Sequence, residues 1–89
     1  MYSVTTERFR KALEKLPFKV RSNAKKAYEL WKIDPYHYSL NFKQIHSTKP
    51  IYSVRIGLSY RALGVKDDET MVWFWIGSHE EYNNLVQSV

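Results

Sequence analysis

Cysteine is absent from this sequence, glycine occurs three times, and the longest apolar run, residues 71–77, is seven residues long. Without cysteine, neither a disulfide framework nor a zinc or iron–sulfur site with cysteine ligands can form. An apolar run of that length is far too short to cross a bilayer. The first residues lack the apolar stretch of a secretory signal peptide. We therefore expect a cytoplasmic protein that does not associate with membranes.

Aromatic and basic residues are plentiful by contrast. Of the 89 residues, 44% are hydrophobic and 16% aromatic, and the formal net charge is +5. This composition predicts a folded chain rather than a disordered one. The length allows one small domain, which we expect to span residues 1–89. A basic surface predicts a polyanionic partner.

The positive charge is concentrated in the first half of the chain. Residues 1–49 carry eleven basic and four acidic side chains, a net charge of +7, whereas residues 50–89 carry three basic and five acidic ones, a net charge of −2. The surplus falls mainly on predicted helices, where a solvated surface and a binding surface are both compatible with it. Arg55 and Arg61 lie instead among residues typical of β-strands.

Two amphipathic helices are predicted in the first third of the chain. Thr5 or Thr6 can cap the first, in which apolar residues recur at spacings of three and four, and Pro17 ends it. The second helix is expected over residues 18–33 and ends before Pro35, because the residue before proline is displaced from the α region. The very short connection predicts an antiparallel helical hairpin.

From residue 40 onward the hydrophobic period changes to two, which predicts strands. A short helix is expected over residues 80–86 and a short edge strand over residues 1–4. The predicted class is α+β, with an N-terminal α-helical hairpin packed on a twisted antiparallel β-sheet of three to four strands. The first predicted strand begins at Leu40, and the other three span residues 51–56, 60–65 and 70–76.

Most catalytic motifs are missing. The sequence has no glycine-rich phosphate loop, no nucleophile elbow and no calcium-loop pattern. His37, His46 and His79 are far apart in the sequence, and a zinc site would need all three to converge. We therefore expect neither a metal nor another cofactor.

Two arginines and two residues near the C-terminus form the strongest candidate site. Arg55 alternates with apolar residues of its strand and should face away from the core, and Arg61 opens the next strand of the same hairpin. A pair of guanidiniums suits a phosphodiester and, still more, a phosphorane-like transition state. His79 can transfer protons near neutral pH, and Tyr82 can stack on a base or donate a proton.

Structural roles are open for the same residues. His79 can be a helix cap or a surface residue, and Trp73 and Trp75 are expected in the core. Arg61 shares its parity with Leu63, which looks like a core residue, so that either a bulge redirects Arg61 or the strand begins at Ala62. The arginines can instead form ion pairs with Asp67, Asp68, Glu69, Glu80 or Glu81.

The stretch Ile51-Tyr-Ser-Val-Arg-Ile-Gly-Leu-Ser-Tyr-Arg-Ala-Leu-Gly64 resembles the central hairpin of the RelE/ParE superfamily of toxins, which belong to bacterial type II toxin–antitoxin systems. In those toxins a strand of the type Tyr-x-x-Arg-Ile-Gly precedes a strand that opens with Tyr-Arg-x-Leu. The segment Trp75-Ile-Gly-Ser-His-Glu-Glu-Tyr82 is similar to the terminal Gly-x-His-x-x-Tyr pattern of one subgroup. The helical hairpin and residues 40–45 follow the same layout, so the resemblance covers nearly the whole chain.

The resemblance implies a metal-independent endoribonuclease that cleaves mRNA and inhibits translation. The 2′-hydroxyl attacks the adjacent phosphate, which Arg61 would contact, with Arg55 on the preceding strand. His79 and Tyr82 match the acid–base positions, although Ser78-His79 stands where the family usually has an arginine after glycine. The candidate RNA-binding residues, placed to hold neighbouring phosphates, are Lys25, Lys26, Lys43 and Lys49.

The resemblance also implies partners, and it leaves two alternatives. A small acidic antitoxin would neutralise the toxin, by covering either the basic helices or the apolar sheet around residues 71–76. The target would be mRNA, generally on the ribosome. Members like ParE instead inhibit DNA gyrase without catalysis. The third interpretation is a basic module that binds RNA or protein and does not inhibit growth.

Overall fold

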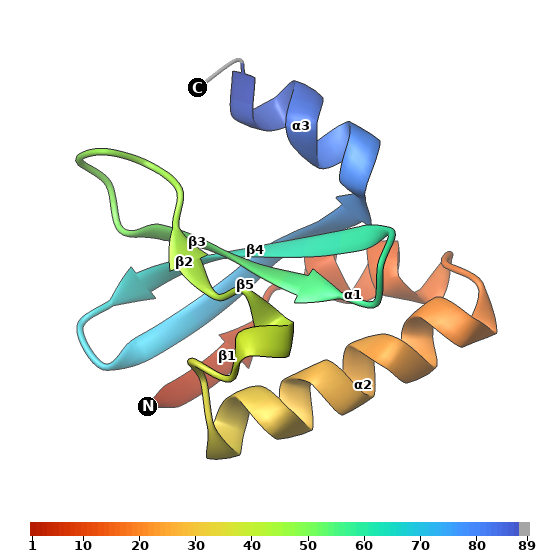
Figure 1. Cartoon of the computed structure of the whole chain (residues 1–89), viewed down its shortest axis with the longest axis horizontal. Coiled ribbons are helices and arrows are strands. Elements are labelled where there is room, and N and C mark those ends of the chain that lie inside the picture. Colours follow the sequence, from red (N-terminus) through yellow and green to blue (C-terminus); the bar gives the residue numbers. More distant parts are fainter. Residues whose placement is uncertain (88–89) are drawn as a thin grey trace.

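Residues 1–87 are described by the computed structural model, and their strands form one five-stranded sheet (Figure 1). The elements in chain order are β1 (Tyr2–Thr5), α1 (Glu7–Glu14), α2 (Phe18–Ile33), the 3-10 turn η1 (Tyr38–Leu40), β2 (Lys43–Gln44), β3 (Ile51–Ile56), β4 (Tyr60–Asp67), β5 (Thr70–Ser78) and α3 (His79–Gln87).

The sheet confirms the predicted α+β class and adds a strand. Its order is β1-β5-β4-β3-β2, in which β1 runs parallel to β5 and the other neighbours are antiparallel. The sheet is therefore mixed, with five strands rather than three or four. The expected N-terminal edge strand is present over Tyr2–Thr5.

The strand predicted from Leu40 is mostly wrong. Leu40 belongs to η1, and Asn41 has a left-handed backbone with φ of 46°, which interrupts any extended segment. Only Lys43 and Gln44 pair with β3. Leu40 and Phe42 alternate in the sequence because both are buried in the core, 2% and 7% exposed, and not because the backbone is extended.

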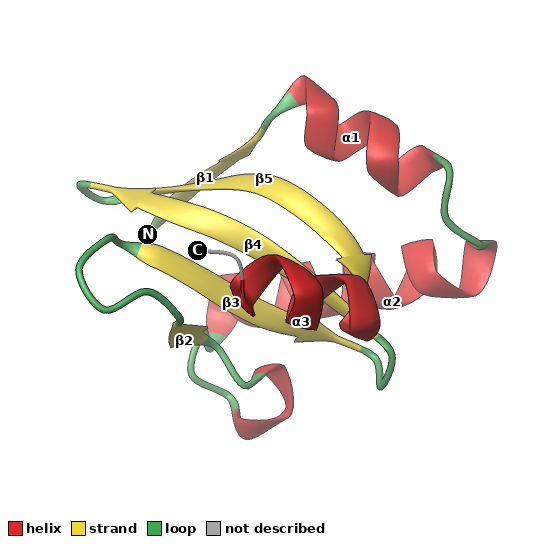
Figure 2. Ribbon diagram, turned by 90° about the horizontal axis from the view of Figure 1, so that it is seen from above, coloured by secondary structure: helices red, strands yellow, loops and turns green. Residues whose placement is uncertain are grey.

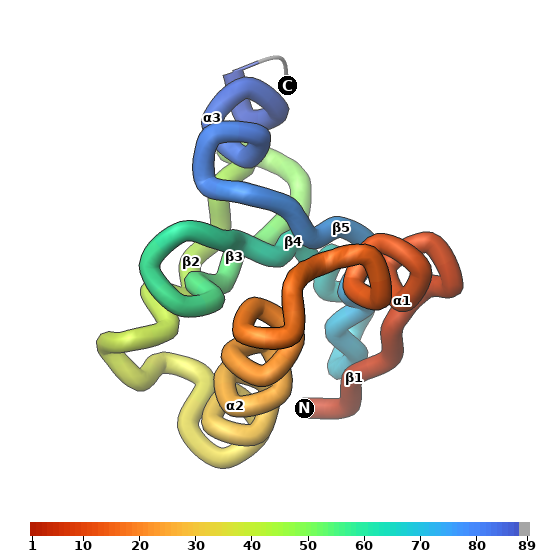
Figure 3. Tube along the Cα trace, turned by 90° about the vertical axis from the view of Figure 1, so that its right-hand side faces the viewer, coloured from red at the N-terminus to blue at the C-terminus, as the bar shows by residue number. Residues whose placement is uncertain are grey.

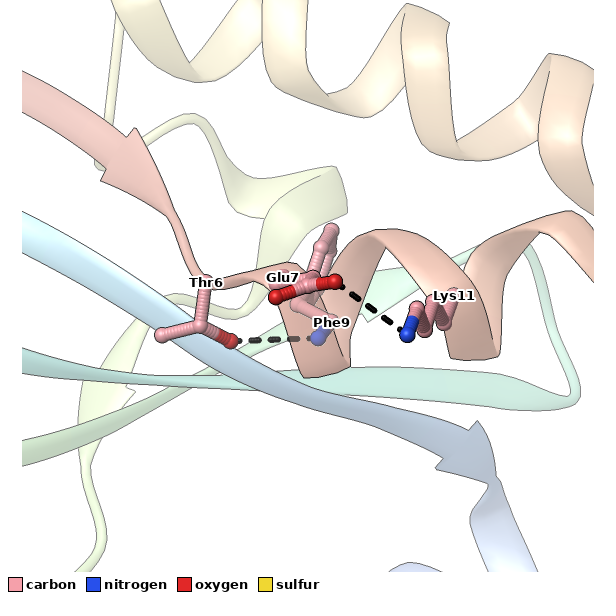
Figure 4. Close-up of polar contacts among 4 residues, drawn as sticks. All are labelled: Thr6, Glu7, Phe9 and Lys11. Atoms are coloured by element: carbon pink, nitrogen blue, oxygen red, sulfur yellow. Dashed lines mark hydrogen bonds and ion pairs between the residues drawn. The ribbon is translucent and has the colours of Figure 1, made fainter.

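Two helices cover one face of the sheet. The Thr6 hydroxyl accepts a hydrogen bond of 3.1 Å from the Phe9 N–H and starts α1, and Glu7 forms an exposed ion pair with Lys11 (Figure 4). α2 follows Pro17 and ends at the Asp34 cap, as predicted. α1 packs against β5 and α2 against β3, on the same side of the sheet (Figure 2).

Aromatic rings fill the space between this helical layer and the sheet. The Trp31 ring meets Trp73 edge-on, with 5.3 Å between ring centroids, and meets Phe42 at 5.9 Å. Met71 is fully buried beside them. This cluster fixes β5 and the segment before β2 relative to α2, and it confirms the core position expected of Trp73.

α3 lies on the opposite face of the sheet from α1 and α2 (Figures 1 and 3). It is longer than the expected helix and packs against β4 and β5. A register shift pairs Leu63 with Trp75 but Gly64 with Trp73, which puts Trp75 on the α3 face. The core position expected of Trp75 is therefore wrong, because one extra residue in β5 reverses its face.

Candidate functional site

The two candidate arginines are direct neighbours across β3 and β4. Gly57 adopts a φ of +61° in the turn, and the register pairs Ile56 with Tyr60 and Arg55 with Arg61. Residues directly opposite each other in an antiparallel pair share one face of the sheet. The hairpin therefore brings Arg55 and Arg61 together on the face that carries α3.

Neither explanation offered for the parity of Arg61 is correct. The strand begins at Tyr60, and the register shift lies beyond Arg61, between Leu63 and Gly64. Leu63 is 3% exposed but lies outside the main core cluster, on the α3 side of the sheet. Arg61 and Leu63 lie two residues apart on one strand and share a face, and both are buried because α3 forms a second, smaller packed layer on that face.

Arg61 is a buried cation beside an aromatic ring. It is 8% exposed, its Nη1 donates to the Tyr60 carbonyl at 3.0 Å, and its guanidinium carbon lies 6.0 Å from the centroid of the Tyr82 ring. Burial, and then the charge of Arg55, lower the pKa of Arg61, while Tyr82 raises it. An arginine still keeps its proton at neutral pH. The site thus holds a positive charge that has little water around it.

Carboxylates do not neutralise these arginines. Within residues 1–87 the ion pair present is that of Lys11 with Glu7, so neither Arg55 nor Arg61 has an acidic partner. The alternative of structural ion pairs is therefore wrong. The Arg55 Nε is buried without a hydrogen-bond partner. Two adjacent cations without counterions are suited to bind an anion.

The start of α3 places His79 and Tyr82 over this face. The Ser78 hydroxyl accepts a hydrogen bond of 3.1 Å from the Glu81 N–H, and Glu81 Oε1 accepts one of 2.9 Å from the Ser78 N–H. This capping box makes Ser78 the helix cap and leaves the His79 side chain exposed. The His79 ring stacks on Tyr82, with centroids 6.1 Å apart and planes inclined by 18°.

Ser53 is part of the site, and the sequence reasoning missed it. Its side chain is 2% exposed, and the buried Tyr82 hydroxyl donates to the Ser53 Oγ over 3.4 Å. That distance is long for a bond between hydroxyls, so the phenol is only weakly held. The sequence contained a signal for it: Ser53 lies two residues before Arg55 on the same strand, so both side chains must lie on the same face of the sheet.

The four candidate lysines separate into two groups. Lys43 pairs with Ser53 across β2 and β3 and therefore shares the arginine face. Lys49 lies in the loop after β2, which rises on the same side as α3 (Figure 1). Lys25 and Lys26 belong to α2, on the other side of the sheet. The structure thus groups Lys43 and Lys49 with the arginines on one face, leaves Lys25 apart, and brings Lys26 near Arg55 only at the edge of the sheet.

The remaining histidines take part in local turns. His37 Nδ1 accepts a hydrogen bond of 3.2 Å from the Ser39 N–H, and His46 Nδ1 accepts one of 3.0 Å from the Lys49 N–H. Nowhere in residues 1–87 do three His, Asp or Glu side chains gather as a metal-binding group.

A groove of about 420 Å³ separates α1 from α2. Its walls are mainly apolar and include Phe9, Leu13 and Tyr28, while Arg21 and Lys25 lie at the exposed surface of α2. Two of its lining residues, Trp31 and Trp73, have buried indole N–H groups without partners. We call this the helix groove. It is an apolar surface bordered by positive charge.

Comparison with known proteins identifies the family. The family model of the ParE-like toxin domain matches residues 19–84, which is most of the chain. The protein therefore belongs to the ParE-like toxins, within the RelE/ParE superfamily that the sequence resembles. No curated protein matches the sequence significantly. No helix within residues 1–87 is long and apolar enough to span a membrane.

Solved structures share the fold at low identity. RelE in the RelB–RelE antitoxin–toxin complex of Methanococcus jannaschii has a TM-score of 0.73 and 18% identity, covering 92% of this chain and 96% of that chain. The isolated E. coli RelE toxin has a TM-score of 0.67 and 20% identity, covering 98% and 96%. E. coli YafQ has a TM-score of 0.68 and 11% identity, covering 90% and 94%. At these identities the similarity shows the fold.

Proposed function

We propose that this toxin is a metal-independent endoribonuclease that cleaves mRNA and thereby inhibits translation. The observation that carries the proposal is the opposed pair Arg55 and Arg61, which lies without carboxylate partners beside Tyr82 and His79. Buried cations stabilise a developing negative charge more strongly than exposed ones, because less water screens them. The fold shared with the RelE toxins and YafQ supports the same assignment.

The reaction requires two proton transfers and charge stabilisation. The 2′-oxygen attacks the adjacent phosphorus, the bond from phosphorus to the 5′-oxygen breaks, and the products are a 2′,3′-cyclic phosphate and a 5′-hydroxyl. The exposed imidazole of His79 accepts the 2′-hydroxyl proton. Tyr82 donates a proton to the leaving oxygen. Its ring contacts both the His79 ring and the Arg61 guanidinium. Arg61 and Arg55 stabilise the phosphorane.

Mapping the 5′ ends of cellular mRNA after induced expression tests this proposal. We expect new 5′ ends and growth arrest with the wild type, and neither with Arg61→Ala. Arg8→Ala, an exposed arginine of α1, removes the same charge away from the site and should cleave normally. New DNA-damage signalling without new mRNA ends would instead assign the protein to gyrase inhibition, the activity implied for members like ParE.

We further propose that a cognate acidic antitoxin binds the helix groove. RelE toxins with the same fold are found in complexes with RelB antitoxins. An amphipathic segment can cover Phe9 and Leu13 with its apolar side and reach Arg21 and Lys25 with acidic side chains.

Co-purification with a small acidic protein encoded by the neighbouring gene tests this interaction. The charge reversal Arg21→Glu/Lys25→Glu should weaken the complex at least tenfold. The matched reversal Arg8→Glu/Lys15→Glu, on exposed residues of α1 and its C-terminal cap, changes the net charge equally and should bind normally. Equal weakening by both pairs would show that only overall charge matters.

A further inference from the structure

A second cleft opens at the edge of the sheet, between α2, η1 and the β3–β4 turn. It encloses about 420 Å³, a volume typical of ligand pockets. β2 pairs only with Tyr52 and Ser53, so among residues 1–87 no strand covers the outer edge of β3 beyond Ser53, on the side away from β4. We call this the edge cleft. Its lining includes Asn23, Lys26, Tyr38, Arg55, Gly57 and Leu58.

The edge cleft is suited to an anion. Lys26 lines it from α2 and Arg55 from β3, and no acidic side chain is among its described lining residues. The Arg55 Nε is buried and has no hydrogen-bond partner. A buried donor without an acceptor is costly, and a bound ligand that supplies an acceptor removes that cost. Phosphate oxygens are the acceptors that guanidinium groups bind best.

Apolar groups at the opening of the cleft are unusually exposed. Tyr38 is 87% exposed and Leu58 is 88% exposed, although both are large. The His37 ring stacks on Tyr38, with centroids 4.7 Å apart. An exposed aromatic ring next to cations is a platform on which an unpaired base can stack.

Arg55 connects the edge cleft to the candidate catalytic site. It lines the cleft and also pairs with Arg61 across the hairpin. We propose that the edge cleft binds one nucleotide of a single-stranded RNA, adjacent to the nucleotide whose phosphate lies at Arg61. The base stacks on Tyr38, and the phosphate contacts Lys26 and Arg55. This inference rests on the proposed function and specifies its substrate as unpaired RNA.

Binding of a non-cleavable RNA tests the edge cleft separately from catalysis. The probe is a fluorescently labelled RNA hexanucleotide with 2′-fluoro riboses, which lacks the attacking hydroxyl, and the measurement is fluorescence anisotropy. We expect Tyr38→Ala to weaken binding about tenfold, and Tyr38→Phe, which keeps the ring, to bind like the wild type. Tyr36→Ala is the matched control, because Tyr36 is exposed on the same segment but does not line the cleft.

The charge contribution has its own control. Lys26→Ala should weaken binding. It should also reduce the slope of log affinity against log salt concentration by about one, because one phosphate contact is lost. Lys19→Ala removes the same charge from another exposed position of α2, which lines neither the edge cleft nor the helix groove, and should leave that dependence nearly unchanged. Melting temperatures equal to that of the wild type should accompany these exposed substitutions, except Tyr36→Ala, which removes a ring that contacts the buried Phe42.

Three results would overturn the inference. The first is equal RNA affinity for Tyr38→Ala, Lys26→Ala and the wild type. The second is displacement of the RNA by adenosine 5′-monophosphate at equal concentration, which would assign the cleft to a free nucleotide. The third is that Tyr38→Ala impairs binding of the antitoxin and not of RNA. Failure of the proposed function is distinguishable, because it appears as an absence of new mRNA ends with the wild type.

Discussion

The guanidinium of Arg61 lies over the ring of Tyr82, with 6.0 Å between the guanidinium carbon and the ring centroid. The two residues come from β4 and α3, so the position of the helix determines the surroundings of the cation. The same helix presents His79 and buries Leu63. Packing of α3 and assembly of the candidate site are therefore one event. Function and stability can be separated here only by substitutions that keep this packing.

Arg61→Met should increase stability while it abolishes RNA cleavage. Folding buries the Arg61 cation beside Arg55 without a counterion, which is why its pKa is lowered. An apolar side chain of similar length removes that cost and keeps the packing against Tyr82. We expect the free energy of unfolding to rise by about 0.5–2 kcal/mol. Denaturant unfolding measures this, and Arg8→Met on exposed α1 should change it by less than about 0.5 kcal/mol.

Arg61→Lys distinguishes the charge from the shape of the guanidinium. Lysine keeps the positive charge but cannot contact two phosphate oxygens with a planar fork. We expect RNA cleavage to fall about tenfold or more with lysine and by on the order of 10²–10³ with alanine. Full activity of Arg61→Lys would show that only the charge at this position matters.

Tyr82→Phe should impair cleavage with little effect on folding. The phenol donates only a long, 3.4 Å hydrogen bond to Ser53, so its loss should cost less than about 1 kcal/mol. A lost proton donor lowers the catalytic rate by about 10²–10⁴. Ser53→Ala removes the other end of the same hydrogen bond and should keep cleavage. Wild-type cleavage by Tyr82→Phe would limit Tyr82 to a packing role.

Local signals predicted the features that depend on neighbouring residues. The helix boundaries at Thr6 and Pro17 follow from capping and from the backbone of proline. The approach of Arg55 to Arg61 follows from a three-residue connection between two strands, which fixes the register. Both kinds of feature are decided within a few residues of the chain, so a sequence pattern contains them.

Contacts between distant segments were not accessible in the same way. The face on which α3 packs decides whether Leu63 and Trp75 belong to the main core, and no local pattern reports that face. Likewise Leu40 and Phe42 alternate as apolar residues of a strand do. Burial of every second residue gives the same sequence pattern whether the backbone is extended or turns, as it does here. The edge cleft combines Tyr38 with Arg55 only after folding.

Gly77→Ala should destabilise the packing of α3 on the sheet. A Cβ at this position would lie 2.6 Å from the Trp75 ring and 3.2 Å from the Glu81 carboxylate. Either the ring or the start of the helix must move, at a cost of about 1–3 kcal/mol. Thermal unfolding and hydrogen exchange of the α3 amides measure the effect. Gly57→Ala strains a left-handed turn and places a Cβ 3.0 Å from the Asn23 amide of α2, so it should also lower stability. Within α3 it should change the exchange of the His79 N–H, which donates to the Ser59 carbonyl of that turn, and not selectively that of the later amides.

The capping box at Glu81 should make the stability of α3 depend on pH. Hydrogen bonds from the backbone N–H of Ser78, and then from its side chain, lower the pKa of Glu81. Because the folded state favours the carboxylate, this stabilisation is fully present above the unfolded pKa and is lost as the pH falls through the lower, folded pKa. Wild type should therefore exceed Glu81→Gln in stability at neutral pH. The difference should begin to shrink as the pH falls to about 4.3 and should disappear below the folded pKa.

The size of that difference is limited by exposure. Glu81 lies at the surface, so water screens it and the difference should be less than about 1 kcal/mol. Amide exchange of α3, measured across the acidic range, reports it more sensitively than global unfolding does. Glu80→Gln removes the adjacent exposed charge, which has no place in the capping box, and should show no such pH-dependent difference. A constant difference between wild type and Glu81→Gln at all pH values would contradict the role assigned to the carboxylate.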